Sequence, residues 1–335
     1  MESVPAYLWF ALFNISLALF VILDGADLGV GALFLAAREP ERSAMAEAIG
    51  PLWYANETWL VIAGTALFGA FPLAYSVILS ALYIPVMMLI FGLMLRAVSV
   101  EFRNHSAHKA FWGAAFGAGS LLAILGLGCV FGGILGSPRV ENGLYAGGPW
   151  DWLNVPSCLI AAGTAAACIM LGAASLVRTT EGAFLNRSWR LLQVAASVAA
   201  GLYVASLAVL PLARTQVADA WAEPPRVFLV PFFLLAGAFC LVMTLSNSLR
   251  RTNERAPLRW SAAVILSSWG AALAAAFPCF VPYSVSIAGA AAPRSSLLFM
   301  LIGAGAVYPV IIAYNVYIRA VFSAKVSGDE PRSKY

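Results

Sequence analysis

The chain has 335 residues, of which 61% are hydrophobic and only 11% charged, and its formal net charge is +4. Soluble globular proteins carry about 25% charged residues, so this composition excludes a soluble protein and indicates an integral membrane protein. The positive charge does not indicate a nucleic-acid partner, because the Lys and Arg residues are divided between connections rather than clustered on one face.

A membrane-spanning helix needs about 20 mostly apolar residues. The sequence contains nine such stretches, and none alternates between apolar and polar residues as the strands of a membrane barrel do. We therefore expect an all-α, polytopic membrane protein that forms a single integral membrane domain over residues 1–335. The expected spans are 7–37, 52–71, 73–95, 111–136, 152–176, 191–212, 227–245, 260–281 and 297–318.

Basic residues in short connections stay on the cytoplasmic side of a membrane. The connections after spans 1, 3, 5 and 7, together with the C-terminal tail, hold 16 of the 20 Lys and Arg residues. This distribution predicts an external N-terminus and a cytoplasmic C-terminus. The start of the chain has no basic region and no small-residue cleavage site, so we expect the first span to stay in the membrane.

The first span contains two carboxylates, Asp24 and Asp27, within an otherwise apolar run. A carboxylate near the middle of a bilayer costs roughly 2.5–3.5 kcal/mol on insertion scales, so two of them indicate a function. Their i,i+3 spacing places them on one helix face, where both cannot easily be ionised, and we expect at least one to be protonated. Gly25, Gly29 and Gly31 would allow another helix to pack closely against this one.

The second span begins with a polar and aromatic cluster at residues 53–59. Glu57 lies one to two turns inside this span, near enough to the cytoplasm to collect protons through water. Tyr54 and Asn56 can supply hydrogen bonds along such a path, although Asn56 is also typical of a helix cap. We therefore predict a proton path through Glu57, Asn56, Tyr54 and the two aspartates.

Four residues near span ends are interpreted as interfacial groups or neighbours of the path. Trp53 and Trp59 are typical of aromatic anchors at a membrane surface. Arg96 and Glu101 lie near the end of the third span. None of the four is predicted to carry a proton.

No predicted span contains a histidine that could be an axial ligand of haem. A membrane haem normally takes a His or Met axial ligand from a span, and the only histidines, His105 and His108, lie in a polar connection. The methionines within spans are more typical of apolar packing. We expect no haem, no other cofactor and no metal bound directly by this chain, and no catalytic residue within it.

Several motifs resemble subunit II of the cytochrome bd-type ubiquinol oxidases, including the cyanide-insensitive branch. The similarity extends over nearly the whole chain and is greatest at residues 20–103. Its carriers are Asp24-Gly25-Ala26-Asp27-Leu28-Gly29-Val30-Gly31, Gly50-Pro51-Leu52-Trp53, Asn56-Glu57-Thr58-Trp59-Leu60 and Gly147-Gly148-Pro149-Trp150-Asp151-Trp152-Leu153.

The resemblance implies a nine-helix subunit of a terminal quinol:oxygen oxidoreductase in the aerobic respiratory chain of a bacterial inner membrane. Its main partner would be a haem-bearing subunit I, holding haems of the b and d types or of b type alone, where quinol is oxidised and oxygen reduced. A small single-helix subunit, membrane lipid and quinone are the other partners implied. By position, Asp24, Asp27 and Glu57 would be the titratable members of a cytoplasmic proton path.

One departure from the family pattern concerns the proton entrance. Family members usually have an acid directly after the tryptophan that corresponds to Trp53, where this chain has Tyr54. A tyrosine is a poor proton acceptor at neutral pH, so the entrance is expected to shift to Glu57. A proton- or cation-coupled secondary transporter, with these carboxylates binding the coupling ion, is the alternative function, and a purely structural scaffold is a third.

Overall fold

The protein is described by a computed structural model that covers residues 4–50, 52–213, 221 and 223–321. Within these residues, eight helices are long and apolar enough to cross a membrane, or nine if one sharply bent pair is counted as a span. The predicted all-α, polytopic membrane fold is therefore confirmed. Most of the C-terminal tail, which we expect in the cytoplasm, lies outside the described residues.

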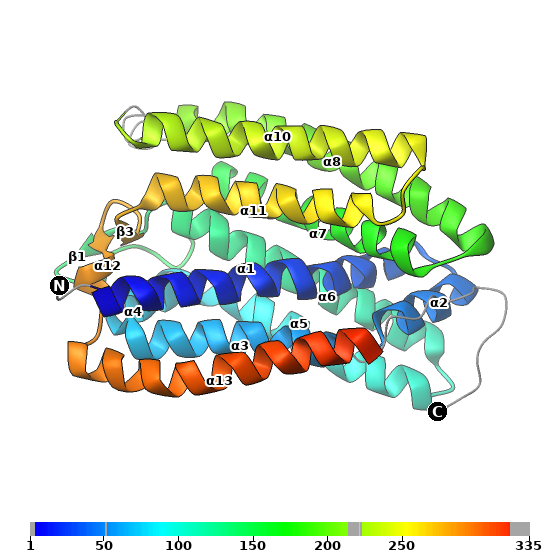
Figure 1. The fold of residues 1–335 in the computed structure, drawn as a ribbon, viewed down its shortest axis with the longest axis horizontal. Helices are drawn as coiled ribbons and strands as arrows, with labels where there is room; N and C mark the ends of the chain where they lie inside the picture. Colours follow the sequence, from blue (N-terminus) through cyan, green and yellow to red (C-terminus); the bar gives the residue numbers. More distant parts are fainter. Residues whose placement is uncertain (1–3, 51, 214–220, 222, 322–335) are drawn as a thin grey trace.

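The long helices form one elongated bundle, in which the helix axes lie roughly along the long axis of the molecule (Figure 1). Helices dominate because a backbone in lipid must satisfy its own hydrogen bonds, which an α-helix does within one segment. Their bounds are α1 Val4–Leu33, α3 Leu52–Ala70, α5 Tyr83–His105, α6 Lys109–Leu135, α7 Val155–Thr179, α8 Gly182–Ala213, α10 Arg226–Arg250, α11 Ala256–Ala276 and α13 Arg294–Val321.

Short elements connect these helices at the two ends of the bundle. One end carries the 3-10 helix η1 (Phe34–Ala36) and α2 (Glu39–Ile49). The other end carries α4 (Pro72–Ala81), α12 (Ile287–Ala290) and two antiparallel hairpins (Figure 1). The hairpin strands are β1 Val140–Glu141, β2 Leu144–Tyr145, β3 Cys279–Val281 and β4 Val285–Ser286.

The predicted third span, 73–95, is wrong in its bounds. The chain instead forms the short helix α4, inclined at 116° to α3, and then a second helix, α5, which continues to His105. Pro72 causes the first break, because proline lacks an N–H and keeps Phe71 out of the helical region, at φ −133° and ψ 61°. As a result Arg96 lies well inside a helix rather than at its end.

The predicted eighth span, 260–281, also ends too late. Helix α11 ends at Ala276, one residue before the Phe277-Pro278 step, and the residues from Cys279 to Val281 form β3. The remaining predicted spans coincide with a helix, although several helices extend further toward the bundle ends than the apolar runs do. Polar first and last turns explain this extension, because hydropathy detects only the lipid-buried part of a helix.

Helix α1 lies in the middle of the bundle and packs against α3, α6 and α7 (Figure 1). Its glycines make this possible. A Cβ on Gly29 would collide with the backbone carbonyl of Cys168 in α7, and one on Gly31 would collide with Ser120 in α6. Gly25 also faces α7, where a Cβ would lie 3.3 Å from the Cys168 sulfur. The close approach of α1 and α7 thus depends on small residues, as membrane helix pairs commonly do.

Substituting Gly29 with leucine should destabilise the bundle by about 1–3 kcal/mol or more, since overpacking forces backbone shifts. Gly201→Leu on α8 is the matched control, because nothing lies within 4 Å of a Cβ at Gly201. The thermal unfolding of the detergent-solubilised protein measures the difference. Equal melting temperatures for the two variants would contradict the packing described for α1 and α7.

Candidate functional site

Three charged side chains from three helices meet inside the bundle. Asp24 comes from α1, Glu57 from the first turns of α3, and Arg96 from the middle of α5. Helices α1 and α3 are packed neighbours, and the Arg96 side chain reaches both of them from α5, which packs on α6. We call this cluster the charged triad.

The triad is centred on the Arg96 guanidinium. Its Nη2 and Nη1 atoms donate hydrogen bonds of 2.8 and 3.0 Å to the two carboxylate oxygens of Asp24, which is a bidentate pairing. Nη2 also donates to Glu57 Oε1 at 3.1 Å. The side chains of Arg96 and Asp24 are 2% and 0% exposed, whereas that of Glu57 is 27% exposed. Arg96 therefore has a fully buried partner and a more accessible one.

Two further residues hold Arg96 in this position. The Trp53 ring packs against the guanidinium, with its centroid 5.4 Å from Cζ, a cation–π contact. On the other side, Gly119 of α6 lies against the Arg96 backbone, since a Cβ at Gly119 would come within 2.8 Å of the Arg96 nitrogen. Close packing of α5 on α6 thus keeps water away from the base of this side chain.

Asp27 lies outside the triad, although it shares a helix with Asp24. Its Oδ2 accepts a hydrogen bond of 2.7 Å from Asn56 Nδ2, which also approaches the Leu23 carbonyl at 3.3 Å. Asn56 is therefore a cross-helix partner of α1 rather than a cap of α3. The two aspartates thus have different hydrogen-bond partners, a guanidinium and a carboxamide, although Asp27 also acts electrostatically on Arg96.

Tyr54 and Glu101 form a third polar contact, toward the end of the bundle that carries α2. The Tyr54 hydroxyl donates to Glu101 Oε1 at 2.5 Å, and both residues are exposed. Tyr54 precedes Glu57 by three residues on α3, which places the two on the same side of that helix. Tyr54 thus brings the Glu101 carboxylate of α5 close to Glu57, the partly exposed member of the triad.

Sequence reasoning did not identify Arg96 as a partner of the aspartates. The sequence analysis places Arg96 in the connection after the third span. The mostly apolar residues that follow Arg96, up to Val100, are the sequence feature that indicates its position inside a helix. The sequence pattern predicts that Trp53 and Trp59 are interfacial anchors, but they are only 6% and 2% exposed and lie inside the bundle. Packing around Arg96 explains the burial of Trp53.

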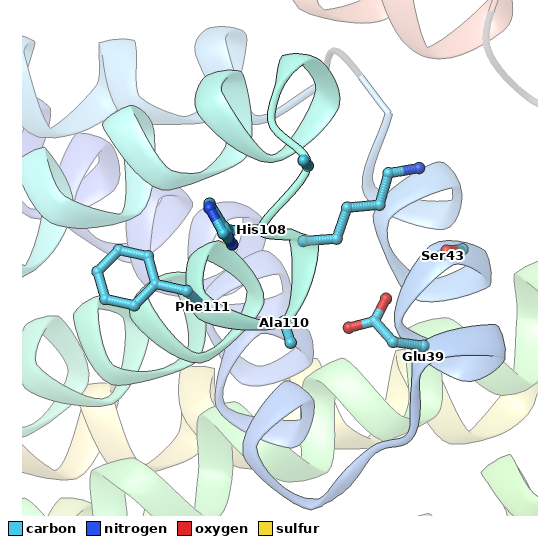
Figure 2. Close-up of a pocket in the computed structure, with 7 residues that line it drawn as sticks. Glu39, Ser43, His108, Ala110 and Phe111 are labelled. Atoms are coloured by element: carbon cyan, nitrogen blue, oxygen red, sulfur yellow. The ribbon is translucent and has the colours of Figure 1, made fainter.

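A second ionic cluster ties η1 and α2 to the helices beneath them. Arg103 of α5 donates to Glu39 Oε2 at 3.1 Å, and Arg187 of α8 pairs with Glu41 at 2.8 Å. Figure 2 shows a shallow pocket beside this cluster, with Glu39 and Ser43 of α2 across from His108, Ala110 and Phe111. Because the Glu39 carboxylate is already paired with arginine, this pocket is poorly suited to binding a cation.

A cavity of about 350 Å³ is lined by residues of α1, α6, α7, α8, α10 and α11. Its walls are mostly apolar and include Phe10, Phe131 and Trp269. Such a lining suits an apolar chain and not a charged substrate. The cavity and the triad are therefore chemically different sites.

The charges of the triad do not cancel. With both carboxylates ionised its net charge is −1, and one added proton makes it neutral. Asp24 accepts two charge-assisted hydrogen bonds from Arg96 and is fully buried, whereas Glu57 accepts one and is 27% exposed. Glu57 is thus the more accessible and the less tightly held carboxylate of the triad.

Comparisons with known proteins give one consistent result. A family model described as cytochrome bd terminal oxidase subunit II matches residues 5–322. The cytochrome bd ubiquinol oxidase subunit 2 of Bacillus subtilis is 30% identical over 97% of both chains. The cytochrome bd-I ubiquinol oxidase subunit 2 of Escherichia coli is 32% identical over 58% of this chain and 54% of that protein.

Among solved structures, a chain of the bd oxidase from Geobacillus thermodenitrificans has the same fold. The TM-score is 0.73 at 14% identity, and the match covers 95% of this chain and 98% of that one. At this identity the likeness concerns the fold alone.

The Asp24–Arg96 pair makes a prediction for stability. Asp24→Leu or Arg96→Met alone leaves an uncompensated buried charge and should destabilise the protein by about 3–5 kcal/mol. The double variant should lose much less than the sum, because each charge is removed with its partner. Thermal unfolding in detergent of the four proteins measures this coupling, and additive losses would show that the two groups do not interact.

Proposed function

Because this chain belongs to the cytochrome bd terminal oxidase subunit II family, we propose that it works beside a haem-bearing subunit I in a quinol:oxygen oxidoreductase of the bacterial inner membrane. In this proposal quinol is the substrate of the complex, and the reaction takes place in subunit I. The chain supports that subunit and conducts protons toward it. The observation that carries the proposal is the charged triad within the fold of this family.

We propose that the haems are held by the partner and not by this chain. His105 lies in the last turn of α5 and His108 follows it in the connection to α6, so neither reaches the membrane interior. These positions support placing the haems in the partner.

We infer that protons enter from the end of the bundle that carries α2. Arg38 and Arg42 belong to the start of α2, and Arg103 and Arg187 pair with carboxylates of α2, which favours a cytoplasmic location of this end. Glu101 and Tyr54 are exposed at this end, and Glu57 lies one turn further in on α3. The proposed order is Glu101, Tyr54 and then Glu57, with Asp24 holding Arg96 in place. Asp27 and Asn56 form the inner part of the path beside it.

The outer face of α3 and α13 is proposed as the docking surface for subunit I. Helix α13 is hardly covered, and Phe299 and Ile302 on it are 79% and 76% exposed. The same face carries the Glu57 carboxylate, which is 27% exposed. If only lipid covered this face, the carboxylate would lie in an apolar medium, and its free energy would be considerably higher than in water. A membrane-embedded protein partner covers that carboxylate and receives its proton.

Glycines on this face strengthen the assignment. Gly64 of α3 and Gly303 and Gly305 of α13 have nothing within 4 Å of the position that a Cβ would occupy. Small residues at a lipid-facing position add no packing within the chain, but they allow a second helix to approach closely. They are therefore suited to contact with subunit I.

Glu57→Gln tests the proton role. Glutamine keeps the size of the side chain and an oxygen for Arg96, but it cannot carry the exchangeable proton. Quinol-driven oxygen uptake by the purified complex should fall about tenfold or more, since a proton-transfer group commonly contributes a factor of about 10²–10⁴. An unchanged haem spectrum confirms assembly.

Glu41→Gln is the control for that experiment, because Glu41 pairs with Arg187 away from the triad. Equal oxygen uptake by both variants and the unsubstituted complex would contradict the proton path. A haem-free preparation without a larger partner, combined with gradient-coupled ion flux in liposomes, would instead favour the secondary transporter.

Gly305→Phe tests the docking surface. A phenylalanine there fills space that the partner helix needs, so subunit I and its haem absorption should no longer co-purify with this chain. Gly201→Phe on α8 is the matched control, because both glycines are exposed and have nothing within 4 Å of a Cβ. Equal recovery of haem with the two variants would move the interface elsewhere.

A further inference from the structure

A line of polar groups follows the contact of α13 with α1 and α3, separate from the charged triad. We call it the polar seam. It differs in composition from the surrounding contacts in this part of the bundle, which are apolar. Its members are Ser16 and Asp27 of α1, Asn56 and Trp59 of α3, and Tyr308 and Asn315 of α13.

Asn315 is buried where apolar residues of the same helix are not. It is 6% exposed, while Val316 and Tyr317 beside it are 64% and 68% exposed. Its Nδ2 donates to the Ile311 carbonyl at 3.0 Å, and its Oδ1 has no hydrogen-bond partner among the described residues. Helix α13 thus directs a carboxamide oxygen, and not a hydrocarbon, into the bundle.

The height of Asn315 can be derived from neighbouring contacts. Helices α1 and α13 run in the same direction, and Tyr308 hydrogen-bonds Ser16 at 2.9 Å. Seven residues further along each helix, or about two turns, Asn315 comes near the level of Leu23, with Pro309 lying within this part of α13. The Leu23 carbonyl is approached by Asn56, which bonds Asp27. Asn315 therefore lies at the level of the Asp27–Asn56 pair.

Trp59 supplies the complementary group. It is 2% exposed, its ring meets Tyr308 at 6.4 Å between centroids, and its indole N–H has no hydrogen-bond partner among the described residues. Trp9 of α1 is similarly buried at 5%, but its N–H donates to the Leu297 carbonyl at 3.0 Å. Within the described part of the chain, the seam thus contains a buried donor and a buried acceptor that protein groups leave unsatisfied.

We propose that the polar seam binds a short file of internal water between the Trp59 indole and the Asn315 carboxamide. Water can accept from the first and donate to the second, and buried water commonly satisfies such groups. A buried donor and a buried acceptor that stay unpaired each destabilise the protein, so water that pairs with both groups is favoured here.

The water file connects the Asp27–Asn56 pair with Tyr308 along α13. Each water accepts a proton from its neighbour on the Asp27 side and releases one to its neighbour on the Tyr308 side, so every O–H bond that forms is matched by one that breaks. This makes the seam a second proton route, beside the one through Glu57, and Asn315 a positioning residue for its water. The proton role, unlike the water site, rests on the proposed function.

Hydroxyl-radical footprinting of the intact complex tests the water site directly. Radicals formed from bound water label adjacent side chains, so Trp59 should be labelled severalfold faster than Trp9, its similarly buried control. Asn315→Leu should reduce Trp59 labelling to the Trp9 level, and Asn315→Ser, which keeps an oxygen, should retain it. Equal labelling of Trp59 and Trp9 in the unsubstituted complex would overturn the proposal.

Oxygen uptake by the same variants tests the proton route. Asn315→Leu should lower turnover severalfold and Asn315→Ser should restore most of it, with the haem spectrum unchanged in both. If Trp59 is labelled rapidly in the unsubstituted complex but Asn315→Leu has normal turnover, the second proton route is overturned. The Glu57→Gln variant tests the first route independently. Normal turnover in Glu57→Gln would concern the proposed function and not the water site.

Discussion

Burial of the Arg96 charge is the constraint on which the centre of this bundle depends. A guanidinium that is 2% exposed must be neutralised where it lies, because moving an unpaired charge out of water costs several kcal/mol. Asp24 does this with two hydrogen bonds, which fixes the distance and rotation of α1 relative to α5. Trp53 and Gly119 complete the enclosure from α3 and α6.

This arrangement separates the roles of the carboxylates. Asp24 is held on both oxygens and has no exposure, so it serves Arg96. Glu57 shares the same guanidinium through one contact and keeps access to the outer face of α3. Asp27 is paired with an amide instead, and it lies on the side of α1 that meets the polar seam. Local partners, and not residue type, therefore distinguish three acids within two helices.

Much of the fold could be predicted because hydropathy acts locally. Apolar runs of sufficient length locate the spans. The glycines of α1 indicate that another helix packs closely against it, and the structure identifies that helix as α7. The failures occurred where a proline acts within an apolar run. Pro72 turns α4 by 116° and Pro278 follows the end of α11, and neither changes the hydropathy on which the bounds were based.

The sequence by itself determined that this is a membrane protein of about nine spans, that acids lie within its first two spans, and that its histidines lie outside the membrane. It also carried the motifs of its family. Which groups are partners becomes visible only in the folded chain, where Asp24 pairs with Arg96, Asp27 with Asn56, and Tyr54 with Glu101. The physical reason is that these pairs join residues 29 to 72 positions apart, so their contacts depend on how helices rotate and pack, which no local pattern records.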